Sequence, residues 1–387
     1  MSSDPLSLTL VIGRLQPGGA ERVLSTMANY WAAKGWPITM ISLTHPEEDP
    51  YYRLHPAVTL RRLDLSWTSM NVAQRFVHNY RGVMTLRGVF RELRPDAVIS
   101  FIDMTNVFTI VVSKLAGIPA IVSERVDLAH YSIPWGWSLL RRLTYPFARR
   151  IVVQCEAIRY SLPFHVRGRA VVIPNPVQVP SITHIESQSD SIIILGMGRL
   201  APQKGFDLLI RAFAQVVTNA PSAQLQIWGQ GPMLAELQAL CAQLGVSGKV
   251  RFPGLTAEPA SVMAQADMFV LSSRFEGFPN VLLEAMAVGL PVIAFDCPSG
   301  PRDIVTNERD GLLITPQDVN SLAAAMLRLI GDRALSRRLG KAAADVRLRF
   351  SVETVMSRWE KELHAVVRKR PRTSFPEAIP KDPISIQ

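Results

Sequence analysis

The chain alternates short apolar runs with longer stretches in which an apolar residue recurs every three or four positions. The short runs predict buried strands at residues 6–12, 38–44, 97–101, 119–123 and 151–155. The longer stretches predict helices; over residues 21–34, for example, the apolar side chains share one face and Gly35 ends the helix. Strands that alternate with helices indicate a parallel sheet covered on both faces.

The pattern restarts after residues 174–190, which are rich in proline, serine and other polar residues and predict an interdomain linker. Further strands are predicted at residues 192–198, 224–229, 250–252, 268–273 and 291–295. One helix is predicted to begin at Phe206, a second to end at Leu244 and a third to end at Val288. Further helices are predicted over residues 317–348 and 352–368. The predicted fold class is α/β, with two Rossmann-like, doubly wound parallel-sheet domains facing a cleft.

These breaks predict how the chain divides. Residues 1–178 would form an N-terminal Rossmann-like domain, 179–190 the linker, and 191–350 a C-terminal Rossmann-like domain. Residues 351–368 would form a helix that could pack back on the N-terminal domain. The tail, 369–387, is proline-rich and lacks periodicity, so we expect it to be disordered.

Composition narrows the class of protein. The 387 residues are 48% hydrophobic and 19% charged, which excludes an intrinsically disordered chain and suffices for two cores. The net charge of +10 favours an anionic partner, which leaves nucleic acid, an anionic membrane face or a phosphorylated substrate. The three cysteines form neither a disulfide framework nor a metal motif, which favours a reducing compartment.

The sequence predicts neither a signal peptide nor a membrane-spanning segment. The N-terminus has no basic region ahead of its short apolar run, so we do not interpret it as a signal peptide. Residues 107–122 are too short and too interrupted to span a bilayer. We therefore expect a cytoplasmic protein that is soluble or peripherally attached.

Two loops that follow predicted strands could approach an anion. Residues 13–21 contain the pair Gly18-Gly19 at a helix N-terminus, where free N–H groups favour negative charge, although a tight turn would also explain them. The second loop, residues 198–205, carries Arg199 and Lys204, two cations that suit a diphosphate, although a solvated pair on a turn has the same appearance.

The third loop, residues 274–289, is the most specific. It follows a predicted strand, with Pro279 at the start of a helix and Gly289 at its end. Glu276 lies in the loop and Glu284 on the helix. Carboxylates would repel a phosphate, so we expect them to accept hydrogen bonds from ribose and hexose hydroxyls beside N–H groups that bind a diphosphate. This combination predicts a nucleotide-sugar site.

The order and spacing of these motifs resemble glycosyltransferase family 4, whose members are retaining enzymes with the GT-B fold. The resemblance rests on the Glu-x7-Glu run of Glu276 to Glu284, on Gly198-Arg199…Lys204-Gly205, and on the loop at residues 17–20. It covers about residues 6 to 365. A segment around residues 123–127, followed by Trp, Leu-Arg-Arg and Tyr-Pro, more narrowly resembles bacterial transferases that build lipid-linked surface glycans.

The resemblance implies a role for each matching residue. Arg199 and Lys204 would bind the donor diphosphate and stabilise the leaving nucleotide, and Glu276 would contact the transferred sugar. Glu284 would hold the ribose hydroxyls. The other implied donor contacts are the N–H groups of Phe278 and Asn280 on the phosphate, Gly229, Gly231, Arg251 and Leu255 near the base, and Gly18 and Gly19 from the opposite domain.

The resemblance also implies that the N-terminal domain is on the acceptor side and that the C-terminal domain binds the nucleotide-sugar. The acceptor side departs from the family pattern. Many members carry a histidine after the strand that corresponds to residues 119–123, whereas this chain has Glu124 and Arg125 there and His130 about a turn later. We assign no catalytic base, because the departing phosphate of a retaining enzyme can accept the acceptor's proton. We predict no metal and no cofactor, since no Asp-x-Asp and no His/Cys cluster at metal-ligand spacing occurs.

Arginines interleaved with aromatic residues mark two segments of the N-terminal half. These residues suit an anionic membrane interface or a lipid diphosphate, although a solvated surface with packed aromatics explains them equally well. They are Arg75, His78, Arg81, Arg87, Arg91 and Arg94 in the first segment, and Trp135, Trp137, Arg141, Arg142, Tyr145, Arg149 and Arg150 in the second.

The leading hypothesis is a metal-independent, retaining transferase that moves a hexose or N-acetylhexosamine from a nucleotide-sugar, most simply a UDP-sugar. The acceptor would be a glycan or lipid-linked glycan in bacterial surface polysaccharide synthesis, at the inner face of the membrane. The alternatives are a sugar-nucleotide epimerase with a similar fold and a non-catalytic basic module that docks on a membrane. No nucleic-acid-binding motif is present, so nucleic acid is not expected as a partner.

Overall fold

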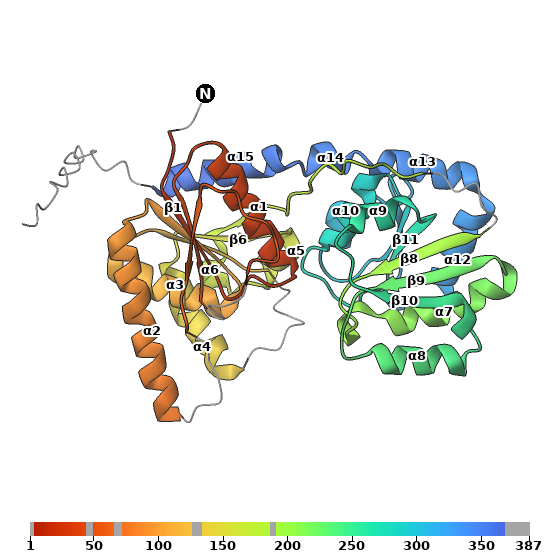
Figure 1. Cartoon of the computed structure of the whole chain (residues 1–387), viewed down its shortest axis with the longest axis horizontal. Helices are drawn as coiled ribbons and strands as arrows, with labels where there is room; N and C mark the ends of the chain where they lie inside the picture. The colour runs from red at the N-terminus through yellow and green to blue at the C-terminus, as the bar shows by residue number, and fades with distance from the viewer. Residues whose placement is uncertain (1–3, 44–48, 66–71, 126–133, 186–190, 368–387) are drawn as a thin grey trace, which may run out of the picture.

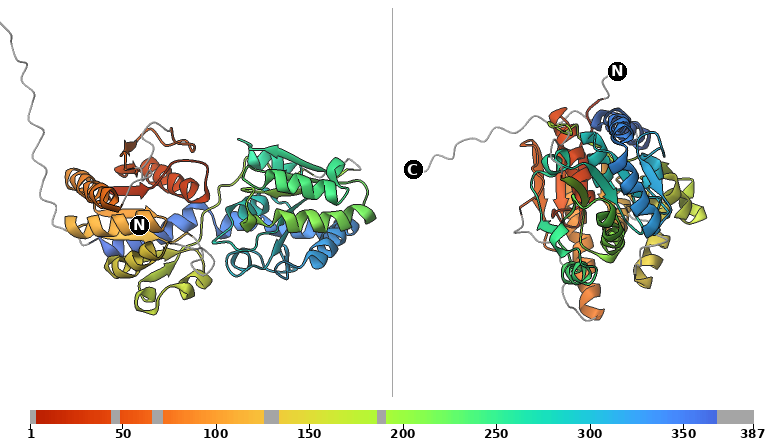
Figure 2. Two further views of the ribbon diagram at one scale, coloured as in Figure 1. Left: turned by 90° about the horizontal axis from the view of Figure 1, so that it is seen from below. Right: turned by 90° about the vertical axis from the view of Figure 1, so that its right-hand side faces the viewer.

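A computed structural model of the chain describes residues 4–43, 49–65, 72–125, 134–185 and 191–367, with the backbone alone described over 72–78 (Figure 1). The predicted disordered tail, part of the predicted linker and His130 lie outside the described residues. The chain forms two α/β domains side by side, each built on its own parallel sheet (Figures 1 and 2). The predicted fold class is therefore confirmed.

The N-terminal domain holds a seven-stranded sheet in the order β3-β2-β1-β4-β5-β6-β7. Its parallel register begins with Leu8 beside Ile38 on one side and beside Ala97 on the other. The strands are β1 (Leu8–Ile12), β2 (Ile38–Ser42), β3 (Val58–Arg62), β4 (Ala97–Phe101), β5 (Ala120–Ser123), β6 (Arg150–Val153) and β7 (Ala170–Val172).

Helices cover both faces of this sheet, as its apolar strands require. One face packs against α1 together with the C-terminal helix, and the other against α2 and α3. The helices are α1 (Gly19–Ala33), α2 (Val72–Leu93), α3 (Asp103–Ala116), α4 (Trp135–Thr144), the 3-10 turn η1 (Tyr145–Phe147), α5 (Glu156–Ser161) and α6 (Phe164–Arg167).

The C-terminal domain holds a six-stranded parallel sheet in the order β10-β9-β8-β11-β12-β13. In both sheets the first strand in sequence lies inside the sheet, so the strand order reverses beside it, which is where open α/β sheets bind ligands. The strands are β8 (Ile192–Met197), β9 (Ala223–Trp228), β10 (Val250–Gly254), β11 (Met268–Leu271), β12 (Val292–Phe295) and β13 (Leu312–Ile314).

Two apolar clusters flank the second sheet, one under α7, α8 and α12 and the other under α9, α10 and α14. Helices α12 and α13 begin at aspartates whose carboxylates accept N–H groups of the first turn. The helices are η2 (Pro202–Lys204), α7 (Phe206–Asn219), α8 (Leu234–Gln243), η3 (Ser247–Lys249), α9 (Pro259–Ala264), α10 (Asn280–Val288), α11 (Pro301–Ile304), α12 (Val319–Gly331), α13 (Arg333–Ala343) and α14 (Val346–Arg349).

The chain crosses between the domains twice. The first crossing follows β7, and the second leads from α14 into α15 (Val352–Val366), which returns to the N-terminal domain (Figure 1). Trp359 and Leu363 of α15 are fully buried in the core under α1. The two crossings touch each other, because the Val177 N–H donates to the Phe350 carbonyl at 2.8 Å.

Some elements were not predicted. Strand β3 mixes polar and apolar residues, strands β7 and β13 are apolar but only three residues long, and all three lie at an edge of their sheet. Across the described ranges, no helix is both long and apolar enough to cross a membrane.

Candidate functional site

The three predicted loops follow the carboxyl ends of parallel strands, and the two domains contact each other there. Residues 13–18 connect β1 to α1, residues 198–205 connect β8 to α7, and residues 272–279 connect β11 to α10. Because strands in a parallel sheet end at one edge, the second and third loops lie side by side, since β8 and β11 are neighbours.

A largely buried ion pair joins the second and third loops. The Lys204 Nζ atom lies 2.6 Å from Oε1 of Glu276, and the two side chains are 18% and 7% exposed. Gly205 permits this approach: its φ of +61° suits glycine, and a Cβ atom there would lie 2.1 Å from the Ser272 carbonyl oxygen. The structure thus brings together two residues predicted to contact the donor.

Serine hydroxyls fix the position of Glu276 further. The Ser273 Oγ donates to the same Oε1 atom at 2.6 Å, and the Ser299 Oγ donates to the Glu276 carbonyl. The carboxylate is therefore held from its side chain and from its backbone, by residues that follow β11 and β12.

Arg274 fastens the same two loops on their outer side. Its guanidinium makes a bidentate ion pair with Asp207 at 2.7 and 2.8 Å, and its N–H donates to the Gln203 carbonyl. Burial alone would raise the pKa of Asp207, but the hydrogen bonds and charge of Arg274 hold that pKa below its usual value. The loop that carries Lys204 is thus rigidly attached to the loop that carries Glu276.

Glycines bring the β9 loop against the β8 loop. Gly229 has a φ of +138°, and a Cβ atom there would lie 1.9 Å from the Gly198 carbonyl oxygen. At Gly231 the corresponding distance to the Leu200 carbonyl oxygen is 2.3 Å. Arg199 is exposed on the β8 loop. Arg251 lies in the next strand, β10, and Leu255 directly follows it; both are exposed.

The N-termini of α1 and α10, one from each domain, converge at the domain boundary. The Asn280 Nδ2 atom donates to the Gly19 carbonyl at 3.3 Å, and the Asn175 Nδ2 donates to Asn280 Oδ1 at 2.7 Å. Gly18 and Gly19 open α1, and Phe278 lies buried just ahead of α10. Two helix N-termini that point at one place make it favourable for an anion.

One helical turn further along, an ion pair links the same helices. Arg22 of α1 contacts Oε1 of Glu284 on α10 at 2.5 Å. Burial raises the pKa of Glu284, and the charge of Arg22 opposes that shift. A recess of only about 10 Å³ remains beside this pair, between the domains.

Glu124, one of the residues predicted for the acceptor side, is buried. Glu124 is 0% exposed, and its Oε2 accepts a 2.7 Å hydrogen bond from the Tyr145 hydroxyl, which also accepts from Asn106. Burial raises the pKa of Glu124 to about 7, opposed by Tyr145 and by Arg141. The Oε1 atom of Glu124 is buried without a hydrogen-bond partner among the described residues.

Arg125, the next residue, is half-buried and packs against Phe101. Its guanidinium carbon lies 3.6 Å from the centroid of the Phe101 ring, and the side chain donates to Asn175 Oδ1. Burial lowers the pKa of Arg125 to about 9. Through Asn175 and Asn280, Arg125 is thus connected to the N-terminus of α1.

The sequence analysis did not single out four residues that shape this site: Arg22, Asn175, Ser273 and Ser299. Arg22 lies on the turn that follows Gly18-Gly19, so helical periodicity places it near that loop. Ser273 directly follows a predicted strand, which is a usable signal. Asn175 and Ser299 stand in irregular segments, and no local pattern marks them. In the part of the chain with described side chains, no three histidine, cysteine or acidic residues gather as a metal site.

Comparison with known proteins agrees with this geometry. Residues 18–176 match the glycosyl transferase 4-like domain, and residues 182–346 match glycosyl transferases group 1. The lipopolysaccharide core biosynthesis glycosyltransferase LpsD of Rhizobium meliloti is 33% identical over 87% of this chain and 92% of that protein.

Two further relatives match different lengths. A Campylobacter jejuni N-acetyl-D-galactosaminyltransferase, named for a diNAcBac-PP-undecaprenol-linked acceptor, is 26% identical over 92% of this chain and 98% of its own length. The exopolysaccharide phosphotransferase SCO2592 of Streptomyces coelicolor is 36% identical over 52% of this chain, which spans only 21% of that protein.

Among solved structures, HepE of Anabaena in complex with UDP-glucose superposes with a TM-score of 0.76, over 93% of this chain and 100% of that one. At 20% identity this likeness shows a shared fold. The two matched domains, together with the LpsD relative, show that the chain belongs to the glycosyltransferases, with a glycosyl transferase 4-like N-terminal domain and a group 1 C-terminal domain.

Proposed function

We propose that the chain is a retaining, metal-independent glycosyltransferase that moves a hexose or N-acetylhexosamine from a UDP-sugar to a glycan acceptor. The observation that carries this proposal is the Lys204–Glu276 pair beside the converging N-termini of α1 and α10. Positive charge and helix N-termini suit the donor diphosphate, and the carboxylate suits the sugar hydroxyls. Arg199, exposed on the neighbouring loop, would contact the same diphosphate.

The arrangement of Glu276 suggests how the sugar is held. Within the described part of the chain, both side-chain donors to its carboxylate meet Oε1. Oε2 is then the oxygen that accepts a hydrogen bond from a hydroxyl of the transferred sugar. Lys204 holds Glu276 in place through their ion pair, while its own charge faces the diphosphate.

Glu284 would bind the ribose, and that requires a change at the domain boundary. Its carboxylate is now paired with Arg22, and the recess beside it is too small for a nucleotide. Donor binding therefore opens the Arg22–Glu284 pair and replaces it with ribose hydroxyls. Gly229, Gly231, Arg251 and Leu255 line the side of the site where the base would lie.

The reaction needs no side-chain base. The bond between the anomeric carbon and the diphosphate oxygen breaks, and the acceptor hydroxyl forms a new bond to that carbon on the same face. The departing phosphate oxygen accepts the hydroxyl proton, so UDP leaves with the proton and the anomeric configuration is retained. Arg199, Lys204 and the α10 N-terminus stabilise the charge that develops on the phosphate. Glu124, with its buried carboxylate, supports the acceptor side of the domain.

The comparisons support the choice of donor and pathway. HepE was solved with UDP-glucose, and relatives are named for lipopolysaccharide core, amylovoran and undecaprenol-linked glycan synthesis. We infer that this chain acts in bacterial surface polysaccharide or glycoconjugate synthesis on a lipid-linked acceptor. Its place would be the cytoplasmic face of the membrane.

The surface of α4 supports contact with such a membrane. Trp135 is 82% exposed, and Leu139, Leu143 and Phe147 are each about half exposed on the same stretch. Arg142 and Arg149 are exposed beside them, so apolar and cationic side chains alternate as they do at membrane interfaces. Tyr145 and Arg150, also predicted for this surface, instead bond to Glu124 and to Glu362 of α15.

Analysis of the transfer product tests the enzymatic proposal. The full chain would be incubated in EDTA with a panel of UDP-sugars and undecaprenyl-diphosphate oligosaccharides, and the anomeric configuration of the product read by NMR. We expect a product with the anomeric configuration of the donor. Inverted configuration, or activity only with divalent metal, would contradict the mechanism, and a changed sugar nucleotide without acceptor would indicate an epimerase.

Sedimentation with vesicles tests the membrane contact. We expect binding to phosphatidylglycerol vesicles at low salt and weaker binding of the variant Trp135→Ser/Leu143→Ser. Leu348→Ser, at a leucine of the C-terminal domain that is 77% exposed, is the matched control. Equal pelleting of all three proteins, or none, would refute a role for α4.

A further inference from the structure

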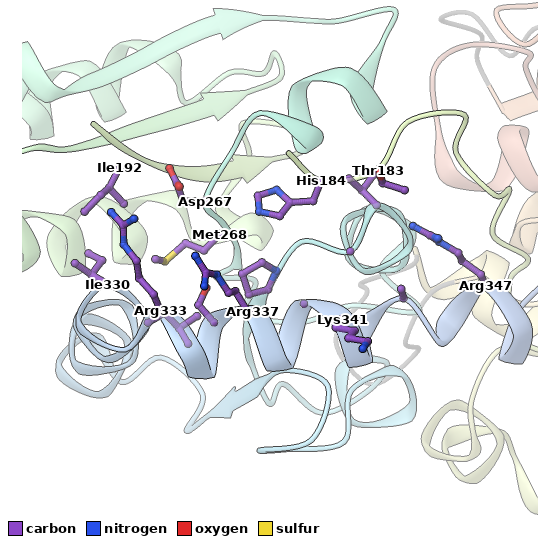
Figure 3. A pocket seen from close by; sticks show the side chains of 17 residues that line it. Thr183, His184, Ile192, Asp267, Met268, Ile330, Arg333, Arg337, Lys341 and Arg347 are labelled. Atoms are coloured by element: carbon purple, nitrogen blue, oxygen red, sulfur yellow. The ribbon is translucent and has the colours of Figure 1, made fainter. Parts of the chain in front are cut away.

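A second cavity lies in the C-terminal domain, at the sheet edge opposite the donor loops (Figure 3). Its volume is about 330 Å³, within the range of small-molecule sites. Ile192 at the start of β8, Met268 at the start of β11 and Pro291 just before β12 line it. Because these positions mark the beginnings of parallel strands, the cavity is separate from the site at their ends.

Cations dominate the wall of this cavity. Arg333, Arg337 and Lys341 come from α13 at intervals of four residues, which places them on one face of the helix. Arg347 follows from α14. Among the described residues that line the cavity, Asp267 is the one acidic side chain, so their charge is predominantly positive.

The cavity is lined by apolar as well as polar side chains, and we call its apolar part the floor. Ile192, Met268 and Ile330 supply the floor. Figure 3 shows Arg333 and His184 on either side of Asp267, whose Oδ2 accepts the Ile193 N–H at 2.7 Å. Burial raises the pKa of Asp267, and the charges of His184 and Arg333 oppose the shift. An anion with a partly apolar, hydroxyl-bearing body therefore fits better than a simple inorganic ion.

Close packing holds the cavity in shape. A Cβ atom at Gly340 of α13 would lie 2.5 Å from the Gly289 carbonyl oxygen, so this helix rests directly on the end of α10. Arg347 Nε donates to the Ala287 carbonyl at 2.5 Å, also on α10. The helix whose N-terminus faces the donor site thus ends at this cavity.

Both interdomain crossings contribute to the wall. Thr183 and His184 belong to the first crossing, and the His184 N–H donates to the Val288 carbonyl at 2.8 Å. Arg347 lies just before the second crossing, where the Val177 N–H bonds to the Phe350 carbonyl. A ligand in the cavity would contact both connections at once.

We propose that this cavity binds a soluble small molecule that carries a phosphate or diphosphate group on a partly apolar body, such as a nucleoside phosphate. Arg333 and Arg337 would hold the phosphate oxygens in the manner of guanidinium–phosphate pairs, and the apolar floor would hold the body. Binding orders both interdomain crossings. This site does not depend on the reaction assigned to the other edge of the sheet.

The test uses the full chain with Arg199→Ala, which weakens anion binding at the donor loops, and two probes, pyrophosphate and AMP. We expect calorimetry to detect binding, and hydrogen exchange to show protection in peptides covering residues 178–185 and 333–347. Adding Arg333→Gln/Arg337→Gln should weaken binding at least about tenfold, roughly 1.4 kcal/mol. Ser336→Phe, which fills the cavity without changing its charge, should abolish binding of both probes.

Arg338→Gln is the matched control, because Arg338 is on the same helix but bonds to the Glu308 carbonyl outside the cavity. Its affinity for both probes should stay unchanged. The proposal is overturned if neither probe binds, if protection is confined to residues 199–205 and 276–284, or if Arg338→Gln weakens binding as much as the double variant. Protection by phosphatidylglycerol vesicles alone would also overturn it, since that would assign the cations to a lipid headgroup.

Discussion

The two sides of the domain boundary use polar residues in opposite ways. On the C-terminal side, Lys204, Glu276 and Arg274 tie two loops together at the edge of the sheet, while Arg199 stays exposed. On the N-terminal side, Glu124 and its hydrogen-bond partners lie in the protein interior. The side assigned to the donor is thus a set of preorganised, largely buried ion pairs with an exposed arginine beside them, whereas the described side assigned to the acceptor is a polar core beneath a surface that is apolar and cationic at α4.

Under the proposed function, this difference matches what each side would recognise. A nucleotide diphosphate presents the same charges and hydroxyls to every enzyme that uses it, so fixed cations and carboxylates suit it. Acceptors differ in linkage and in lipid, and an exposed aromatic and basic surface suits a membrane-bound substrate. The comparison can be broken by changing one residue on either side.

The largest effect is expected at Glu276. Glu276→Gln keeps the size of the side chain but removes the charge that holds Lys204 and accepts from the sugar. We expect kcat to fall about 10³-fold, roughly 4 kcal/mol of barrier. Steady-state transfer assays measure it, with Glu353→Gln, an exposed glutamate on α15, as control. A loss below about tenfold would place the sugar elsewhere.

The next effect concerns the β9 loop. Gly229→Ala introduces a Cβ atom 1.9 Å from the Gly198 carbonyl oxygen at a φ of +138°. Strain and overlap together should lower the free energy of unfolding by about 4 kcal/mol. Gly248→Ala is the control, since a Cβ atom there meets nothing within 4 Å. Equal denaturation midpoints would show that the two loops do not lie against each other.

On the acceptor side, Glu124 makes stability depend on pH. Its pKa in the folded protein, about 7, is above the ordinary value of 4.5, so the folded state binds the proton more tightly than the unfolded state. Stability should therefore fall as pH rises from 4.5 to 7, by roughly 3 kcal/mol from this group. Glu124→Gln should remove that fall, as measured by urea unfolding across this range.

The same variant tests the role of Glu124 in catalysis. If the carboxylate is structural, kcat should remain within about tenfold of wild type, less than roughly 1.4 kcal/mol of barrier. A larger loss of kcat in Glu124→Gln, together with a wild-type kcat that rises with pH near 7, would identify Glu124 as the catalytic base. An unchanged pH dependence of unfolding would show that the carboxylate is not buried in solution.

The smallest effect is expected at the ion pair between the domains. Arg22 is 31% exposed, so Arg22→Gln should change the free energy of unfolding by less than about 1 kcal/mol. UDP should bind the variant more tightly, because Glu284 no longer exchanges Arg22 for the ribose. Calorimetry with UDP measures this, and weaker binding would mean that Arg22 itself contacts the donor.

Local patterns in the sequence predicted most of the fold and the edge of the sheet at which the proposed donor loops lie. Arg199, Lys204, Glu276 and Glu284 each follow a strand with a clear apolar run, so their edge of the sheet could be inferred. Strand β3 was missed because this edge strand mixes polar and apolar residues, and strand β7 because its apolar run is only three residues long.

Long-range pairings could not be predicted in this way. Arg22 and Glu284 lie 262 residues apart, and Asn175 and Asn280 lie 105 apart. Only the packing of the two domains brings these side chains together. Likewise, the sequence around Glu124 does not reveal whether this residue is exposed or buried. Its hydrogen-bond partner, the Tyr145 hydroxyl, lies 21 residues further along the chain.

The most direct test of the donor site is thermal unfolding of the full chain with UDP, GDP or ADP, in EDTA. Wild type would be compared with Arg199→Ala, and with Arg211→Ala as an exposed arginine on α7 outside the loops. We predict that UDP at 100 times its Kd stabilises wild type and Arg211→Ala by about 2.7 kcal/mol, and that Arg199→Ala loses most of this. Failure of every nucleotide to stabilise the wild-type chain would contradict the donor site assigned to this edge of the sheet.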